Sequence, residues 1–399
     1  ATPSPPEAPP VVAEALERDL QRLAKSRGWT IEETRQRHAE TKALNRVLAR
    51  VAEDHPDIYV GGIAPASPGD DPVLLVKGKA GGDVHDLVAH EPATKIVVKD
   101  QQPFSLAELQ DRQRRLHDSL TAMGYRNVAS LADIERGGEI RANVGFENGM
   151  PSTHAEILPK LPESLREATA VSFMEPKAFR NEATWGGNIL NGTANPHPLG
   201  RCTSGFTVRF GPWTRGFLTA GHCVWTWGVD HVATESGEIF DAPWVFGYLH
   251  IGGYGDWAVH QASTTHESQF RASPTEIRSV WDVEDGPIAN NTTVSFYSRQ
   301  EFDVFDVDVE SGSFLCEIDG YPTVNRLTLM DNTEDISSGG DSGAAWFVGS
   351  TAYGVHKGRC PMTDPDQVAF TPIHTIKRYF EVLAPSAPSV EVTRWWEWW

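Results

Sequence analysis

The 399-residue chain contains no apolar run of about 18 residues, the length that a membrane-spanning helix needs, so we expect no membrane span. It has only four cysteines and no Cys-x-x-Cys pair, which fits two disulfides of an exported protein better than a metal or thiol-redox site. It opens Ala1-Thr2-Pro3-Ser4, without methionine, as a chain does after a secretion signal has been removed. The sequence therefore predicts a secreted protein that needs no metal or other cofactor.

Charge and tryptophan are distributed unevenly along the chain. Residues 1–184 hold 28 acidic and 23 basic residues, a net charge of −5, whereas residues 185–399 hold 26 and 12, a net charge of −14. Twelve of the 13 tryptophans also lie in the second part. The composition thus predicts a domain boundary near residue 184. Because so acidic a second part would repel phosphate backbones, we expect no nucleic-acid partner.

The first 184 residues are expected to form an α+β domain. Apolar residues recur at helical spacing in three segments, and the second of these begins with the capping-box pattern Thr30-Ile31-Glu32-Glu33. His85 and His90 lack the metalloprotease pattern, so we interpret them as surface histidines. The expected helices cover 11–27, 30–52 and 105–123, and the expected strands cover 58–64, 73–76 and 95–98, with two more within 128–144.

Residues 185–399 are expected to form an all-β domain. Short strand-like segments alternate with turns rich in glycine and asparagine, as in a barrel or a sandwich. One helix is expected near the C-terminus, at 373–383. The expected strands cover 206–210, 217–220, 245–249, 258–262, 293–297, 302–309, 326–330 and 344–348.

Two motifs in this second part carry candidate catalytic residues. Ser342 lies within Gly339-Gly340-Asp341-Ser342-Gly343, and His222 lies within Thr219-Ala220-Gly221-His222-Cys223. A serine hydroxyl is scarcely ionised at neutral pH and needs a neighbouring base, which a histidine can provide. Each residue alone could be structural, but their joint occurrence predicts a serine nucleophile with His222 as its general base.

A carboxylate is expected to orient the imidazole and to stabilise its protonated form. Asp256 is the leading candidate, because it stands where a glycine-rich turn enters the apolar segment Trp257-Ala258-Val259. The alternatives are Asp230 and Asp241, which lie in loops closer to His222 in the sequence.

The backbone near these groups is also expected to take part. Acyl transfer creates an oxyanion that needs two N–H donors, and we assign these to Gly340 and Ser342. Cys202 and Cys223 would close a short loop that ends beside His222, so we expect a disulfide between them.

Four segments of residues 185–399 occur together in the order that is typical of one protease family. They are Gly200-Arg201-Cys202-Thr203-Ser204-Gly205-Phe206, Phe217-Leu218-Thr219-Ala220-Gly221-His222-Cys223, Asp256-Trp257-Ala258-Val259 and Gly340-Asp341-Ser342-Gly343. The domain resembles the chymotrypsin-fold serine peptidases, most of all their bacterial streptogrisin and α-lytic protease branch. The resemblance implies an all-β, trypsin-like fold of two six-stranded antiparallel barrels with a C-terminal helix. It also implies an endopeptidase that cleaves polypeptide substrates through an acyl-enzyme.

The first part resembles, in its layout, the pro-region of that branch, which assists folding and then blocks the active site until it is removed. Charged helices, short strands and a final strand at Val171–Met174 precede the protease domain. The resemblance implies a pro-region at 1–184 and a peptidase domain at 185–399, with cleavage somewhere in 180–187. The chain would then be a zymogen whose own pro-region is an intramolecular inhibitor.

Some residues depart from the family pattern. The family usually has a cysteine just before the Gly-Asp-Ser-Gly motif, where this chain has Ser338, and Cys316 resembles a cysteine whose usual partner is replaced here. A rewired disulfide between Cys316 and Cys360 would account for both changes. A buried arginine of this branch often pairs with the aspartate before the nucleophile. Arg299 resembles it as a partner for Asp341, the alternative being a surface arginine.

Substrate preference is expected to depend on Gly354-Val355-His356-Lys357-Gly358, which resembles one wall of the primary pocket in this fold. Glutamyl endopeptidases carry a histidine there that binds the substrate carboxylate. His356, with Lys357 beside it and Gly354 and Gly358 along the wall, thus implies cleavage after Glu or Asp. Lys357 stands where the family commonly has a small residue, so the alternative is an altered pocket with a structural His356. The negative charge of the domain opposes acidic substrates at long range, but salt screens that field.

The tail Arg394-Trp395-Trp396-Glu397-Trp398-Trp399 has no counterpart in the family. We expect it to pack on the barrel, or alternatively to bind a partner or an insoluble substrate. We expect a monomer. Two alternatives to a processed endopeptidase remain: a protease-fold binding module whose triad is vestigial, and an enzyme that an uncleaved N-terminal domain keeps permanently inhibited.

Overall fold

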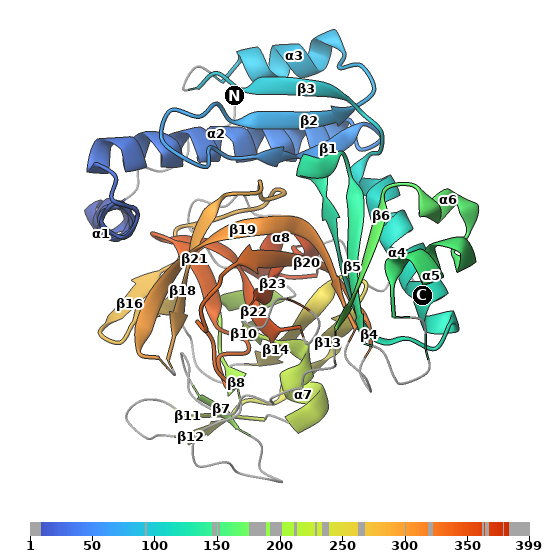
Figure 1. Ribbon diagram of the computed structural model, residues 1–399. Helices are drawn as coiled ribbons and strands as arrows, with labels where there is room; N and C mark the ends of the chain where they lie inside the picture. Colours follow the sequence, from blue (N-terminus) through green and yellow to red (C-terminus); the bar gives the residue numbers. More distant parts are fainter. Residues whose placement is uncertain are drawn as a thin grey trace.

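The fold is taken from a computed structural model, in which the first part of the chain packs beside and above a β-barrel of the second (Figure 1). None of the helices in the part described is both long enough and apolar enough to span a bilayer. The expected junction at 180–187 and the tryptophan-rich tail lie outside the described residues. The described residues are 9–91, 94–145, 150, 152–174, 189–191, 202–210, 214–227, 230–233, 239–261, 268–299, 301–317, 322–360, 363, 367–377 and 379–382.

Two long helices, α1 (Pro10–Arg27) and α2 (Ile31–Asp54), open the fold. The predicted capping box forms at the start of α2. The Glu33 N–H donates to Thr30 Oγ1 at 3.2 Å, and the Glu33 carboxylate accepts from the Thr30 N–H at 2.8 Å. Each helix buries one apolar face, so the helical spacing of the sequence predicts both correctly.

A small sheet of order β1-β2-β3 packs against α2. β1 and β2 are antiparallel, whereas β2 and β3 are parallel. Leucines and valines of α2 share one apolar cluster with residues of this sheet and of α3. The elements are β1 (Tyr59–Ile63), β2 (Val73–Lys77), α3 (Gly82–Ala89) and β3 (Val97–Gln102).

A second layer of the first part combines strands β4, β5 and β6 with helix α4. Leu109, Leu116 and Leu120 of α4 are fully buried against these strands. β4 and β5 are antiparallel, and β6 returns parallel to β5. The elements are α4 (Leu106–Ala122), β4 (Arg126–Asp133), η1 (Ile134–Arg136), β5 (Glu139–Gly145), α5 (His154–Ile157), η2 (Leu158–Lys160), α6 (Glu163–Arg166) and β6 (Thr169–Met174).

The second part contains a closed barrel of six antiparallel strands. Its order is β18-β21-β22-β23-β20-β19, and pairing between β19 and β18 closes it. Aromatic side chains, among them Phe296, Trp346 and Phe370, fill its core. The strands are β18 (Thr293–Ser298), β19 (Asp303–Cys316), β20 (Val324–Asp331), β21 (Ala345–Val348), β22 (Thr351–Arg359) and β23 (Val368–Pro372).

The barrel continues into the first part through one strand pair. Phe314–Cys316 of β19 pair antiparallel with Ala129–Leu131 of β4, so that β4, β5 and β6 extend the barrel sheet (Figure 1). The two parts of the chain are therefore joined by backbone hydrogen bonds as well as by side chains.

The described residues confirm one of the two predicted six-stranded barrels. In place of the other they form a five-stranded sheet, β13-β14-β10-β9-β24, and a four-stranded sheet, β12-β11-β7-β8. β15 and β16 form a separate hairpin, and β17 pairs with β22. The elements are β7 (Ile189–Asn191), β8 (Cys202–Thr203), β9 (Thr207–Phe210), β10 (Thr214–Thr219), α7 (Gly221–Trp227), β11 (His231–Ala233), β12 (Ile239–Asp241), β13 (Trp244–Gly252), β14 (Gly255–Gln261), β15 (Gln269–Ser273), β16 (Glu276–Ser279), β17 (Asp282–Val283) and β24 (Glu381–Val382).

The helix predicted at 373–383 is wrong in length. α8 covers only Ile373–Ile376, and Glu381–Val382 form strand β24 against β9. Phe380 is fully buried and contacts the ring of Trp257 edge-on. Burial of this aromatic residue and pairing with β9 therefore outweigh the local helical pattern.

Both expected disulfides are present. Cys202 is bonded to Cys223, 21 residues along the chain, and Cys316 is bonded to Cys360, 44 residues along the chain. Cys316 ends β19, the strand that contacts the first part, and Cys360 directly follows β22. The second bridge therefore links the end of β19 to the end of β22.

Replacing both cysteines of the longer bridge (Cys316→Ser with Cys360→Ser) is expected to lower the free energy of unfolding by about 2–4 kcal/mol, because the bridge restricts the unfolded chain. Denaturant unfolding of the variant and the native chain measures the loss. The Cys202–Cys223 bridge closes a shorter loop and restricts the unfolded chain less, so its removal should lower the free energy of unfolding by a smaller amount. Identical unfolding midpoints for the native chain and the Cys316/Cys360 variant would contradict the prediction.

Candidate active site

The structure brings His222, Asp256 and Ser342 together from three separate elements. His222 lies at the start of α7, Asp256 lies on β14, and Ser342 lies in the turn before β21. His222 Nε2 is 2.9 Å from Ser342 Oγ, and His222 Nδ1 is 2.6 Å from Asp256 Oδ2. In the neutral histidine, Nδ1–H can thus donate to the carboxylate while Nε2 accepts from the serine hydroxyl. These are the contacts through which a base could activate a serine.

Asp256 is held rigidly beside the histidine. It is 1 % exposed, and its Oδ1 also accepts a hydrogen bond from the His222 backbone N–H at 2.8 Å. Its own backbone N–H donates to Thr371 Oγ1 at 2.9 Å. Burial acts to raise the pKa of Asp256, but the charges of His222 and Lys357 and the hydrogen bonds from His222 lower it below its usual value. The carboxylate is therefore ionised at neutral pH, as an orienting group should be.

The two alternative acids are placed elsewhere. Asp241 is exposed and pairs with His231 at the β11–β12 ladder, and Asp230 precedes β11. The carboxylate that contacts the His222 ring is that of Asp256.

The turn around Ser342 is fixed by the buried side chain of Asp341. This carboxylate accepts hydrogen bonds from Ser298 Oγ at 2.8 Å, from the Ser338 N–H at 3.0 Å and from the Arg299 N–H at 3.2 Å. The contact seen for Arg299 is thus through its backbone, and the predicted role of its guanidinium stays a prediction. Ser298, at the end of the neighbouring strand β18, is a supporting residue that the sequence did not reveal.

Glycines on either side of the nucleophile give the turn its shape. Gly340 has φ of 109° and Gly343 has φ of 95°, a region that other residues rarely adopt. A Cβ on Gly343 would also lie 2.1 Å from the carbonyl oxygen of Thr203. No described residue accepts a hydrogen bond from the N–H of Gly340 or Ser342, which leaves both donors available for the oxyanion role predicted for them.

His356 lies in the barrel core, with no exposed surface. Its Nδ1 accepts from Trp346 Nε1 at 3.2 Å, so Nε2 carries the proton and donates to Ser337 Oγ at 2.8 Å. Its ring stacks on Phe296 at 4.5 Å between centroids, and burial lowers its pKa to about 3. The sequence leaves two interpretations of His356, a histidine that binds the substrate carboxylate and a structural histidine; here the ring is neutral and both of its nitrogens are hydrogen-bonded inside the protein.

The neighbours of His356 in the predicted pocket wall differ in their surroundings. A Cβ on Gly354 would lie 2.1 Å from Phe370 Cδ2, so this glycine packs closely on a core ring. A Cβ on Gly358 would lie 4.0 Å from Ser342 Oγ, which places this glycine beside the nucleophile. Lys357 is 5 % exposed, and its Nζ donates to the carbonyl oxygen of Arg359 at 3.3 Å.

One further cluster has the residue types of a metal site. Ligand atoms of Cys202, His222 and Cys223 lie within 4.8 Å of one another. The two sulfurs are bonded in a disulfide, so they offer no thiolate to a metal ion.

Comparison with known proteins finds likeness in structure only. No protein-family model matches the chain, and no curated protein matches it. Among solved structures, a glutamic acid specific serine protease that utilizes a novel histidine triad in substrate binding is 18 % identical over 46 % of this chain and 93 % of its own, with a TM-score of 0.36. An α-lytic protease homolog, N4, is 18 % identical over 50 % of this chain and all of its own, with a TM-score of 0.38. Thermobifida fusca Protease A is 21 % identical over 51 % of this chain and 99 % of its own, with a TM-score of 0.36. Over about half of its length, the chain is thus similar to chymotrypsin-fold serine proteases at low sequence identity.

Proposed function

We propose that this protein is a serine endopeptidase, and the pair of hydrogen bonds that His222 makes to Ser342 and Asp256 carries the proposal. Ser342 Oγ attacks the peptide carbonyl carbon while His222 Nε2 takes its proton. Asp256 stabilises the imidazolium, and the N–H groups of Gly340 and Ser342 bind the oxyanion. His222 then protonates the leaving amine, and water hydrolyses the acyl-enzyme by the same route. The two disulfides fit an extracellular place of action.

Covalent labelling distinguishes this proposal from a protease-fold binding module. A fluorophosphonate should label the native chain at Ser342, and mass spectrometry of the digested protein should locate the adduct on that residue. Peptide hydrolysis should be lost in proportion to labelling. A chain that is unlabelled, both as expressed and after removal of residues before 185, would favour the binding module.

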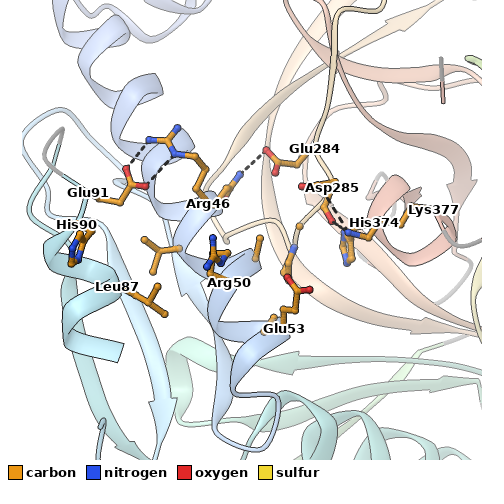
Figure 2. A pocket seen from close by; sticks show the side chains of 16 residues that line it. Arg46, Arg50, Glu53, Leu87, His90, Glu91, Glu284, Asp285, His374 and Lys377 are labelled. Carbon is orange, nitrogen blue, oxygen red and sulfur yellow. Dashed lines mark hydrogen bonds and ion pairs between the residues drawn. The ribbon is translucent and has the colours of Figure 1, made fainter. Parts of the chain in front are cut away.

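The proposal includes a division of the chain, with residues 1–184 acting as a pro-region and inhibitor of the peptidase domain 185–399. This division is supported by the contact between the two parts, which combines the pairing of β19 with β4 and ion pairs between side chains. The contact also leaves a cavity of about 740 Å³, bordered by the Arg46–Glu91 ion pair on one side and by Glu284, Asp285 and Lys377 on the other (Figure 2). Ion pairs and unfilled space of this kind occur at contacts between domains that move relative to one another.

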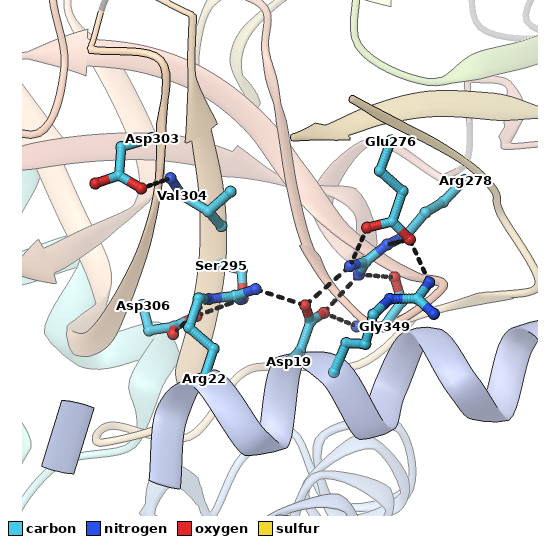
Figure 3. Close-up of polar contacts among 10 residues, drawn as sticks. Asp19, Arg22, Glu276, Arg278, Ser295, Asp303, Val304, Asp306 and Gly349 are labelled. Atoms are coloured by element: carbon cyan, nitrogen blue, oxygen red, sulfur yellow. Dashed lines mark hydrogen bonds and ion pairs between the residues drawn. The ribbon is translucent and has the colours of Figure 1, made fainter. Parts of the chain in front are cut away.

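Helix α1 contributes the most buried of these ion pairs (Figure 3). Asp19, which is 3 % exposed, accepts from Arg278 Nη1 at 2.6 Å and from the Gly349 N–H at 2.7 Å. Arg22, one turn further along α1, contacts Asp306 of β19 at 2.7 Å. Charged side chains of the first part thus form ion pairs with oppositely charged side chains of the acidic second part.

Asp19→Ala is expected to lower the free energy of unfolding by about 1–3 kcal/mol, because Arg278 keeps only its Glu276 partner and the buried Gly349 N–H loses its acceptor. Urea unfolding of the full chain measures this loss. Arg27→Ala removes a half-exposed pair with Asp308 and serves as the control, with an expected loss below about 1 kcal/mol. If the first part inhibits the second, Asp19→Ala should also raise the labelling rate of Ser342. An unchanged rate despite lost stability would favour a first part that does not inhibit.

Preference for Glu or Asp before the scissile bond is a finer element of the proposal. Because the His356 ring is neutral, a substrate carboxylate would have to replace Ser337 Oγ as acceptor of the Nε2–H. Digestion of a peptide library tests this directly. Cleavage after Arg or large aromatic residues, with none after Glu or Asp, would exclude the acidic preference and leave His356 a structural role.

A further inference from the structure

The strand joint between the two parts of the chain is completed by Glu317, which directly follows β19. The Glu317 N–H donates to the Val128 carbonyl oxygen at 2.8 Å, and the Val128 N–H donates to the Glu317 carboxylate at 3.2 Å. These bonds continue the β19–β4 pairing by one residue beyond Cys316 and Ala129. Glu317 therefore holds β4 through its backbone and through its side chain.

Helix α4 contacts the same joint through Gln113 and, one turn later, through His117. Gln113 is buried, and its Nε2 donates to the carbonyl oxygens of Ser130 on β4 at 3.1 Å and of Ser313 on β19 at 3.3 Å. Its Oε1 accepts from Ser313 Oγ at 2.8 Å. The amide of Gln113 carries no charge at any pH, whereas the imidazole of His117 titrates near neutral pH.

The His117 ring lies between two carboxylates. Its Nε2 is 3.3 Å from Glu317 Oε2 in the second part, and its Nδ1 is 3.3 Å from Asp118 Oδ1 on its own helix. Nε2 is also 3.3 Å from the hydroxyl of Thr323, which directly precedes β20. A neutral imidazole carries one proton, so one of its nitrogens would turn a lone pair toward a carboxylate, whereas the protonated ring can donate to both. The geometry therefore favours the imidazolium.

The charged groups around the ring set the pH range in which this ion pair exists. Burial lowers the pKa of His117, but the hydrogen bonds and charges of Glu317 and Asp118 raise it above its usual value. Burial raises the pKa of Glu317, but the hydrogen bonds from His117 and Val128, with the charges of His117 and of Arg126 on β4, lower it below its usual value. With Glu317 ionised, the stabilisation by His117 is fully present below about pH 6.5, the ordinary pKa of histidine. It is lost as the pH rises through the raised pKa of His117.

We propose that His117 is a pH-dependent latch between the two parts of the chain: the protonated ring fastens α4 to Glu317 beside the β19–β4 joint, and loss of the proton loosens that joint. Gln113 and the strand pairing hold the two parts together at every pH, so the latch changes how readily the joint opens rather than whether it forms. The latch itself requires no catalysis. Its use, an easier release of the first part in neutral to alkaline solution, rests on the proposed function.

Hydrogen exchange of the full chain tests the latch without relying on peptidase activity. Mass spectrometry gives the protection factors of the backbone amides in Ala129–Leu131 and Phe314–Cys316 from pH 5.5 to pH 8.5, corrected for the intrinsic pH dependence of exchange. In the native chain this protection should fall by about tenfold over the range, the factor that one pKa unit represents. The fall should follow the titration of the His117 ring, whose nitrogen-15 signals are identified by their loss in His117→Leu.

Matched variants separate the charge of the latch from packing. His117→Leu should lower the protection at pH 5.5 by about tenfold and abolish its dependence on pH. Glu317→Gln keeps the ring and should have the same two effects, so it decides the matter if His117→Leu does not fold. Gln113→Leu removes the uncharged contact and should lower the protection by one factor at every pH. His85→Gln removes an exposed histidine and should change nothing.

Two results would overturn the inference: protection that does not depend on pH in the native chain, or protection that falls with pH equally in the folded His117→Leu and Glu317→Gln variants. If the first part inhibits the second, His117→Leu should also raise the fluorophosphonate labelling rate of Ser342 at pH 5.5, relative to the native chain, but not at pH 8.5. An unchanged labelling rate would leave the latch standing and reject the inhibitory role. A latch in a chain that never labels would stand while the peptidase is rejected.

Discussion

Ser342→Ala should reduce the rate of peptide hydrolysis by a factor on the order of 10⁶, the scale of loss when a serine nucleophile is removed from such a triad. His222 Nε2 lies 2.9 Å from the Ser342 hydroxyl, and alanine can form no ester with substrate. The hydrogen bonds of Asp341 and the glycines of the turn remain, so the N–H donors should persist. Single-turnover hydrolysis of a fluorogenic peptide, with intact mass after fluorophosphonate treatment, measures both rate and adduct.

Ser338→Ala is the matched control for this variant. Ser338 lies in the same turn, and its hydroxyl contacts Glu301. The substitution removes this hydroxyl but keeps the Ser338 N–H, which donates to Asp341. Its rate should stay within a few-fold of the native chain. Hydrolysis by Ser342→Ala at the native rate would show that another residue is the nucleophile.

Asp256→Asn should lower the rate by about 10⁴ while the site keeps its shape. The two carboxylate oxygens now accept from the His222 N–H and from Nδ1–H. An amide offers only one acceptor oxygen, and its NH₂ group facing Nδ1 would favour the tautomer that is protonated on Nε2. That tautomer cannot take the proton of Ser342.

Asp241→Asn is the control, because Asp241 is an exposed acid close to His222 in the sequence and was an alternative third member. Its rate should be unchanged. Urea unfolding of both variants checks that the loss in Asp256→Asn is not a loss of fold. Equal rates for Asp256→Asn and the native chain would remove Asp256 from the proposed machinery.

The placement of the three triad candidates could be predicted because each lies in a short local pattern. A small glycine-rich turn must surround a nucleophile, and a histidine beside a disulfide stands out from its neighbours. Thr371 could not be predicted, since it contacts Asp256 across 115 residues and a threonine before a proline is unremarkable in sequence. Supporting residues of this kind are defined by the fold rather than by a motif.

The predictions of secondary structure follow the same rule, because elements set by local contacts are predicted well and elements set by distant contacts are not. The start of α2 is set by a local hydrogen-bonding pattern at Thr30 and Glu33, so the sequence predicts it well. The predicted C-terminal helix is wrong in length because Phe380 packs against Trp257, a residue far away in the sequence. The burial of His356 is likewise a tertiary property, since strand periodicity does not say which of two faces will meet a second layer.

The pairing of β19 with β4 has a consequence for the barrel under the proposed removal of residues 1–184. Phe314, Leu315 and Cys316 are 2 %, 3 % and 0 % exposed, and they would become an open sheet edge with unused N–H and C=O groups. Such an edge can accept a strand from any neighbouring molecule. The bond from Cys316 to Cys360 anchors that edge to the barrel wall, which limits how far it can peel away.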